Sequence, residues 1–197
     1  MTGLLALVIA YVVGGIPFGY LLVRLKTGED VRSKGSGNIG ATNVLRTTGR
    51  AVAVVTLLLD IGKGFFAVWL AGRLTSGSPE WMSLAALAVM AGHAYPVFLK
   101  FHGGKAVASF IGAFAYLTPV PLAAVLVILV IVVAATRYIS MGSIAAAGSL
   151  PLAVWLILHP PGAVLAASLV AAVFIIYRHS SNIGRIRAGT ESVFRFK

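Results

Sequence analysis

Glycines, small polar side chains and one arginine are concentrated in residues 34–46, which read KGSGNIGATNVLR. Glycines let backbone N–H groups approach an anion closely, and a guanidinium is a planar fork that suits phosphate or carboxylate. The segment therefore predicts an anion-binding loop, although a flexible loop with turn glycines is the alternative. It is not a P-loop, because the order G-x-x-x-x-G-K-[ST] is absent. The residues expected to bind the anion are Ser36, Gly37, Asn38, Asn43 and Arg46.

A second polar segment, residues 92–105, reads GHAYPVFLKFHGGK. Gly103 and Gly104 stand directly before an expected helix, so their amides and the helix N-terminus could face a phosphate. Lys105 would add a point charge. His93 lies about two turns before the end of its apolar stretch, a position more typical of a hydrogen-bonded packing histidine than of a catalyst.

The third polar segment, residues 178–185, reads RHSSNIGR and leaves the last apolar stretch. If the helix continues, His179 and Asn182 share one face and Arg185 lies close to it. The alternative is a basic, polar exit from a membrane.

Polar residues elsewhere lie in apolar surroundings. Asp60 and Lys63 would be costly facing lipid, so we expect a structural ion pair or support for a site. Ser143 could add a hydroxyl to an anion site, or cap the helix that it begins, and capping is favoured.

Composition places these segments in a membrane protein. Of 197 residues, 59% are hydrophobic and only 11% charged, whereas about a quarter are charged in soluble domains. The net charge of +11 suggests nucleic acid at first, but long uncharged stretches argue against it. The absence of cysteine excludes disulfides, thiolate catalysis and cysteine-ligated metals.

The hydropathy pattern predicts an all-α integral membrane protein of about seven helices, some short, forming one domain over residues 1–197. About 20 apolar residues cross a bilayer, and prolines and glycines mark the breaks. A five-span arrangement is the alternative. The predicted helices are 4–23, 51–70, 81–99, 106–117, 122–135, 143–158 and 163–177.

Positive charges set the expected orientation, because short cytoplasmic loops carry the excess of lysine and arginine. With the N-terminus outside and the C-terminus cytoplasmic, all three polar segments share the cytoplasmic face. That arrangement is what a site for an anionic ligand needs. Fourteen of the sixteen basic residues then lie inside: Arg24, Lys26, Arg32, Lys34, Arg46, Arg50, Lys100, Lys105, Arg137, Arg178, Arg185, Arg187, Arg195 and Lys197.

Taken together, the three segments resemble those of the bacterial acyl-phosphate:glycerol-3-phosphate acyltransferases, the PlsY family. The matching residues run from Gly35 through Arg46, from Gly92 to Lys105, and from His179 to Glu191, and residues 60–64 (DIGKG) match as well. The resemblance covers essentially the whole chain. The His-x4-Asp pattern of the common glycerolipid acyltransferases is absent.

This resemblance implies a multi-pass enzyme of the bacterial inner membrane that makes 1-acyl-glycerol 3-phosphate, with its active site facing the cytoplasm. The implied partners are glycerol 3-phosphate, a fatty acyl phosphate, membrane lipids and an enzyme that supplies the acyl phosphate, without metal, organic cofactor or nucleic acid. An acyl phosphate is already activated, so no covalent nucleophile is required. Arg46 and Lys105 would hold the glycerol phosphate, and Ser36, Gly37, Asn38, Gly103 and Gly104 would bind phosphate oxygens.

His179 is the candidate general base or substrate-positioning residue, with Asn182 orienting it. A phosphate of the substrate is the rival base, because the sequence reveals no histidine–carboxylate pair. A membrane transporter of phosphate-bearing metabolites is the alternative function, since basic residues and broken helices also suit transport. The outer loops, however, contain few polar groups, and no internal repeat is evident.

Overall fold

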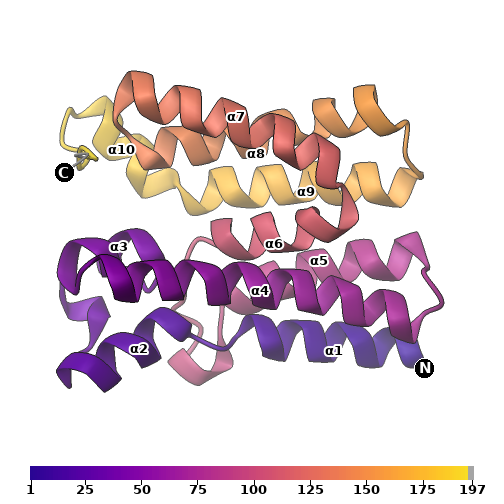
Figure 1. The fold of residues 1–197 in the computed structure, drawn as a ribbon, viewed down its shortest axis with the longest axis horizontal. Coiled ribbons are helices and arrows are strands. Elements are labelled where there is room, and N and C mark those ends of the chain that lie inside the picture. The colour runs from indigo at the N-terminus through magenta and orange to yellow at the C-terminus, as the bar shows by residue number, and fades with distance from the viewer. Residues whose placement is uncertain (195–197) are drawn as a thin grey trace. The chain divides into compact units, whose positions relative to one another are not determined.

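A computed structural model describes residues 1–194, and within that range it contains helices and no strands. The chain divides into two compact units, residues 1–117 and residues 118 onward. Each unit is a set of packed helices (Figure 1). Arg195 and Lys197, two of the basic residues predicted to be cytoplasmic, lie outside the described residues.

The first unit contains six α-helices and two short 3-10 turns. Helix α4 packs against α1, α2, α3, α5 and α6, and α1 packs along α5. The elements are α1 (Thr2–Gly14), α2 (Phe18–Thr27), η1 (Val31–Ser33), α3 (Ala41–Thr47), α4 (Arg50–Leu74), α5 (Pro79–Ala94), η2 (Val97–Leu99) and α6 (Val107–Leu117).

The first predicted helix is broken near its centre. Helix α1 ends at Gly14 and α2 begins at Phe18, with Pro17 as its N-cap. Proline has no N–H to donate and its ring clashes with the preceding turn, which explains the break. Residues 4–23 were predicted to form one helix, and the structure instead separates two helices.

Two glycines let helices of this unit approach closely. A Cβ atom on Gly14 would collide with the Val89 carbonyl of α5, and one on Gly112 would collide with the Ile61 carbonyl of α4. Small residues at such crossings favour close packing of membrane helices. The apolar stretches around them are therefore packing faces as well as lipid-facing surfaces.

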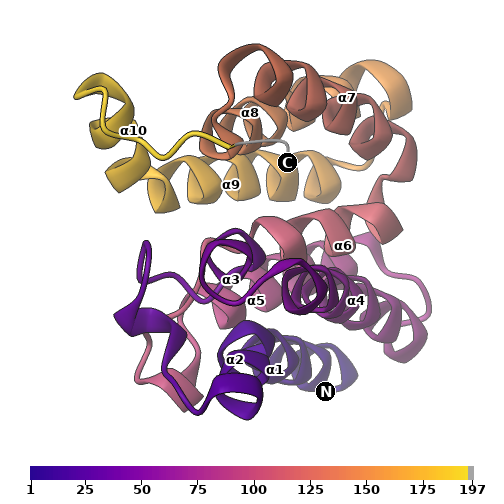
Figure 2. The same ribbon diagram turned by 60° about the vertical axis from the view of Figure 1, so that its left-hand side comes forward.

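The second unit contains four helices: α7 (Pro119–Thr136), α8 (Ile139–Leu158), α9 (Gly162–Arg178) and α10 (Ser180–Arg187). Helix α8 packs against α7 and α9. Helix α10 turns from the axis of α9 by 53° (Figure 2). Pro119 and Pro121 lie in the first turn of α7, where proline is tolerated, so the helix begins three residues before the predicted start at residue 122.

Among the described residues, five helical segments are long and apolar enough to cross a membrane. The bent pair α9–α10 would make a sixth, and α6 is a shorter apolar helix. Every segment predicted to be helical contains a helix, so the all-α prediction is confirmed. The number of crossings and the orientation of the termini remain predictions. The five segments are Thr2–Thr27, Arg50–Leu74, Pro79–Leu99, Pro119–Thr136 and Ile139–Leu158.

Candidate active site

The loop before α3 is organised by the side chain of Asn43, which is 1% exposed. Its Nδ2 lies 2.9 Å from the Asn38 carbonyl oxygen and 3.1 Å from that of Lys34. It also lies 3.2 Å from the Val31 carbonyl, while Oδ1 accepts from the Ser36 amide at 2.9 Å. Asn43 was predicted to bind the anion, but these contacts use both ends of its amide. Its role in this structure is to fold the loop.

We expect Asn43→Asp to lower kcat/KM at least about tenfold, because a carboxylate cannot donate to the backbone carbonyls and each lost hydrogen bond is worth about 1 kcal/mol. Steady-state kinetics of the purified protein would measure the loss. Thr47→Val is the matched control, since the Thr47 hydroxyl contacts only neighbours at the end of α3, the Asn43 carbonyl and the Thr48 hydroxyl. Equal activity of Asn43→Asp and Thr47→Val would contradict this role.

Other residues of the loop leave polar groups at its surface. Ser36 and Gly37 are exposed. The Gly37 amide donates to the Lys34 carbonyl, and the Asn38 Oδ1 accepts from the Gly40 amide at 2.8 Å. The Ser36 hydroxyl and the Asn38 side-chain amide are therefore donors that this loop offers to an anion, whereas the predicted Gly37 backbone amide is already occupied.

The basic residues of this region differ in how they are paired. Arg32 contacts the carboxylate of Asp30 through Nη2 at 2.6 Å, and this hydrogen-bonded guanidinium holds the pKa of Asp30 below its usual value. Lys34 pairs with Glu29 at 2.5 Å. Arg46, which is exposed, forms no ion pair within residues 1–194. Its charge remains for a ligand.

Gly103 and Gly104 lie where the chain turns back, after η2, onto the end of α5. The Gly103 amide donates to the Ala94 carbonyl and the Gly104 amide to the His93 carbonyl, each at 3.1 Å. Both amides are thus used by the turn, and neither is left for a phosphate as the sequence had predicted. The turn instead fixes the position of the Lys105 backbone, two residues before α6 begins.

A shared hydrophobic cluster supports the first two polar segments. Val31, Ile39 and Val44 from the loop and α3 pack in the same buried cluster as Leu99 from η2. Each is at most 6% exposed. The structure therefore places both segments on one core of the first unit, as their proposed common role requires.

In the second unit, Glu191 is the centre of a hydrogen-bonded cluster that we call the Glu191 latch. Its Oε1 accepts from Asn182 Nδ2 at 2.6 Å and from the Ser140 hydroxyl at 2.8 Å. Its Oε2 accepts from Arg185 Nε at 2.7 Å. Burial alone would raise the pKa of Glu191, but these hydrogen bonds outweigh it and the pKa lies below its usual value.

Asn182 was predicted to orient His179, and the role of Glu191 as its hydrogen-bond partner was not predicted. The signal was present, because only five acidic residues occur in the chain and Glu191 is the only one near the third segment. Four of the five form ion pairs with lysine or arginine. Asn182 and Arg185 were predicted as site residues, and the latch holds both in place.

His179 lies where α9 ends and α10 begins, and it is 3% exposed. Its Nδ1 is 2.8 Å from the Ile175 carbonyl oxygen, and a carbonyl can only accept, so Nδ1 carries the hydrogen. In a neutral ring Nε2 then has the lone pair, and it can accept a proton or a hydrogen bond.

Ser143 is one turn inside α8 rather than at its start, so the prediction that it caps the helix is wrong. Its hydroxyl donates to the Ile139 carbonyl at 2.9 Å. The helix begins four residues earlier, at Ile139, with Tyr138 as its N-cap, and a serine inside a helix can bond the carbonyl four residues back in this way.

A histidine–carboxylate contact, which the sequence did not reveal, is present in the first unit. His93 Nδ1 lies 3.6 Å from Asp60 Oδ1, and the same oxygen lies 2.7 Å from Lys63 Nζ. Asp60 and Lys63 therefore form an ion pair, one of the two roles expected for them. The contact with His93 joins α4 to α5, 33 residues apart in sequence, so no short motif could reveal it.

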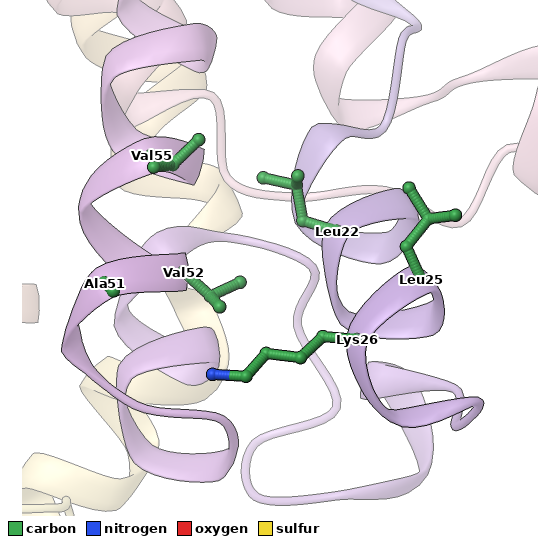
Figure 3. Close-up of a pocket in the computed structure, with 6 residues that line it drawn as sticks. All are labelled: Leu22, Leu25, Lys26, Ala51, Val52 and Val55. Atoms are coloured by element: carbon green, nitrogen blue, oxygen red, sulfur yellow. The ribbon is translucent and has the colours of Figure 1, made fainter.

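An apolar groove of about 350 Å³ lies between α2 and α4 (Figure 3). Leu22 and Leu25 of α2 face Val52 and Val55 of α4, and Lys26 extends across toward α4. The groove combines apolar walls with one cation, a combination that suits an anionic lipid or an acyl chain with a charged head.

Comparison with known proteins agrees with this arrangement. The family model described as glycerol-3-phosphate acyltransferase matches residues 4–189. A glycerol-3-phosphate acyltransferase of Trichlorobacter lovleyi is 47% identical, with 98% of each chain covered. One from Geobacter sulfurreducens is 45% identical, with 99% of each chain covered.

Two solved structures of PlsY, an integral membrane glycerol 3-phosphate acyltransferase, also match. The glycerol 3-phosphate form is 36% identical with a TM-score of 0.93, and the lysophosphatidic acid form is 34% identical with a TM-score of 0.90. Each match covers 99% of this chain and 96% of the other. With a family model and close relatives matching nearly end to end, this all-helical membrane protein belongs to the glycerol-3-phosphate acyltransferase family.

Proposed function

We propose that this protein transfers a fatty acyl group from an acyl phosphate to the 1-hydroxyl of glycerol 3-phosphate, which gives 1-acyl-glycerol 3-phosphate and inorganic phosphate. The observation that carries the proposal is the match to PlsY in forms named for glycerol 3-phosphate and for lysophosphatidic acid, a substrate and a product of this reaction. The reaction would be the first acylation of phospholipid synthesis, and an enzyme that makes acyl phosphate would supply its donor.

In this proposal the first unit binds phosphate. Arg46 and Lys105 hold the phosphate of glycerol 3-phosphate, and the side chains of Ser36 and Asn38 donate to phosphate oxygens. The unpaired charge of Arg46 and the exposed Ser36 support these roles. Arginine is suited to bidentate phosphate binding, and lysine adds a compact charge.

The second unit supplies His179, which accepts a hydrogen bond from the 1-hydroxyl through Nε2. The hydroxyl oxygen forms an ester bond to the carbonyl carbon as the bond from that carbon to the phosphate oxygen breaks. Inorganic phosphate leaves with the electron pair, and the hydroxyl proton passes to His179 or to a phosphate oxygen. Asn182 and Arg185, fixed by the Glu191 latch, and Ser143 provide further polar groups on this unit.

The acyl chain requires an apolar surface, and the groove between α2 and α4 supports such a role. Its four branched side chains could pack along methylene groups, while Lys26 could pair with a phosphate head. In the cell we propose that the protein lies in the bacterial inner membrane and that its anion-binding segments face the cytoplasm, where the basic loops are expected.

The donor is tested with purified protein in lipid nanodiscs, labelled glycerol 3-phosphate and either palmitoyl phosphate or palmitoyl-CoA. We expect labelled lysophosphatidate from palmitoyl phosphate alone. Arg46→Ala should raise KM for glycerol 3-phosphate by about tenfold or more, because it removes a charged phosphate ligand. Arg73→Ala, which removes an exposed arginine at the opposite end of α4, is the matched control. Product from palmitoyl-CoA alone would refute the proposed donor.

A further inference from the structure

Three ionisable side chains are buried together in the first unit. Asp60 and Lys63 lie on α4 and His93 on α5, and none is more than 5% exposed. Lys63 Nζ lies 2.7 Å from Asp60 Oδ1 and 2.8 Å from the Ile16 carbonyl oxygen at the break between α1 and α2. Buried charges are costly unless paired, so Asp60 and Lys63 depend on each other at this position beside His93.

The His93 ring lies between this carboxylate and the glycine turn. Nδ1 faces Asp60 Oδ1 at 3.6 Å, too long for a direct hydrogen bond but close enough for electrostatic attraction. The opposite edge of the ring faces Gly104: a Cβ atom there would collide with Nε2 and lie 2.8 Å from Cδ2. Position 104 must therefore be glycine for the turn to rest on the ring.

The backbone of His93 supports the same turn. Its carbonyl accepts from the Gly104 amide at 3.1 Å, and the neighbouring Ala94 carbonyl accepts from Gly103. Ring and backbone of one residue thus contact the turn from two directions. Lys105 follows Gly104 directly, so a shift of the ring would displace the backbone from which Lys105 extends.

We propose that the Asp60–His93 contact is a positioning element, which sets the place of the Gly103–Lys105 turn and through it the place of Lys105. The inference rests on the proposed function, in which Lys105 binds the phosphate of glycerol 3-phosphate. His93 is accordingly a positioning residue for one substrate. Its loss impairs binding of glycerol 3-phosphate and leaves the acyl phosphate unaffected.

The test compares His93→Asn, whose amide is too short to reach Gly104, with His93→Gln, whose amide can. We expect His93→Asn to raise KM for glycerol 3-phosphate about tenfold, with kcat and KM for palmitoyl phosphate changed less than about threefold. His93→Gln should restore KM to within about threefold of the wild type. His102→Asn is the matched control, because the exposed His102 lies on the same turn and its ring contacts the Lys100 carbonyl.

A double-mutant cycle shows whether His93 acts through Lys105. In a Lys105→Ala background, His93→Asn should change KM for glycerol 3-phosphate by less than about twofold, because the group being positioned is gone. A full tenfold effect in that background would overturn the inference. Unchanged KM in folded His93→Asn would overturn it as well.

Failure of the proposed function has a different signature, because the wild type would then form no labelled lysophosphatidate. Failure of the role proposed for Lys105 would leave KM for glycerol 3-phosphate unchanged in Lys105→Ala alone. Folding is checked by size-exclusion chromatography and Tm. If His93→Asn does not fold, Gly104→Ala tests the same contact from the other side. We expect it to raise KM for glycerol 3-phosphate selectively, and an unchanged KM would overturn the inference.

Discussion

We expect His179→Ala to lower kcat by a factor of about 10² to 10⁴, the range for loss of a group that assists proton transfer. The ring is buried and its Nδ1 is fixed by the Ile175 carbonyl, which leaves Nε2 as the acceptor. Fixed-time assays of labelled lysophosphatidate formation, with both substrates saturating, would measure this loss of kcat. His159→Ala is the control, because His159 is exposed in the turn after α8. A loss of less than about tenfold would contradict a direct role of His179.

Asparagine and glutamine at position 179 separate the two possible roles. Either side chain can make a hydrogen bond, but neither can take up a proton at neutral pH. Activity retained by His179→Asn or His179→Gln would assign His179 to substrate positioning and the proton to a phosphate oxygen. Loss in both variants as severe as in His179→Ala would assign it as the general base.

Glu191→Ala is expected to lower kcat/KM by about 100-fold, because displacement of site residues by 1 Å can cost that much. The substitution leaves Asn182 Nδ2, Arg185 Nε and the Ser140 hydroxyl without the carboxylate that each contacts. Glu191→Gln retains one acceptor oxygen and loses the charge, so its loss should be intermediate. Steady-state assays and Tm would measure both effects.

Glu29→Gln is the control for this prediction, because Glu29 forms an exposed pair with Lys34 and exposed pairs contribute little.

The latch also has an expected pH dependence. Since the pKa of Glu191 is lower in the folded protein, the stabilisation is present above the ordinary value of 4.5 and is lost as pH falls through the folded-state pKa. A wild-type kcat/KM in Glu191→Ala would contradict the role of the Glu191 latch in holding the site residues in place.

Local chemistry made much of the fold predictable. The apolar stretches marked the helices, and Pro119 and Pro121 marked the break before α7, whereas the break at Pro17 divided a stretch predicted as one helix. The start of α8 was misplaced, because Ser143 suits an N-cap but equally bonds the carbonyl four residues back inside a helix. Cap preference alone could not decide between these two uses.

The site was harder to predict because its residues act through tertiary contacts. Asn43 is a residue type that can bind an anion. Its side-chain amide instead donates to backbone carbonyls, the most distant of which is 12 residues away in sequence. Glu191 meets Ser140 across 51 residues, and His93 meets Asp60 across two helices. Residue type identified the polar segments, and only the packed chain distinguishes the groups that face a ligand from those that hold the loops.

The central claim is that glycerol 3-phosphate is acylated rather than transported, and partition of its label tests this most directly. Proteoliposomes containing the protein are given labelled glycerol 3-phosphate with or without palmitoyl phosphate, then filtered and extracted with organic solvent. We expect label in the organic phase only when palmitoyl phosphate is present, with one inorganic phosphate released for each lysophosphatidate. Label that enters the vesicle lumen in water-soluble form, with or without the donor, would contradict the account and identify a transporter.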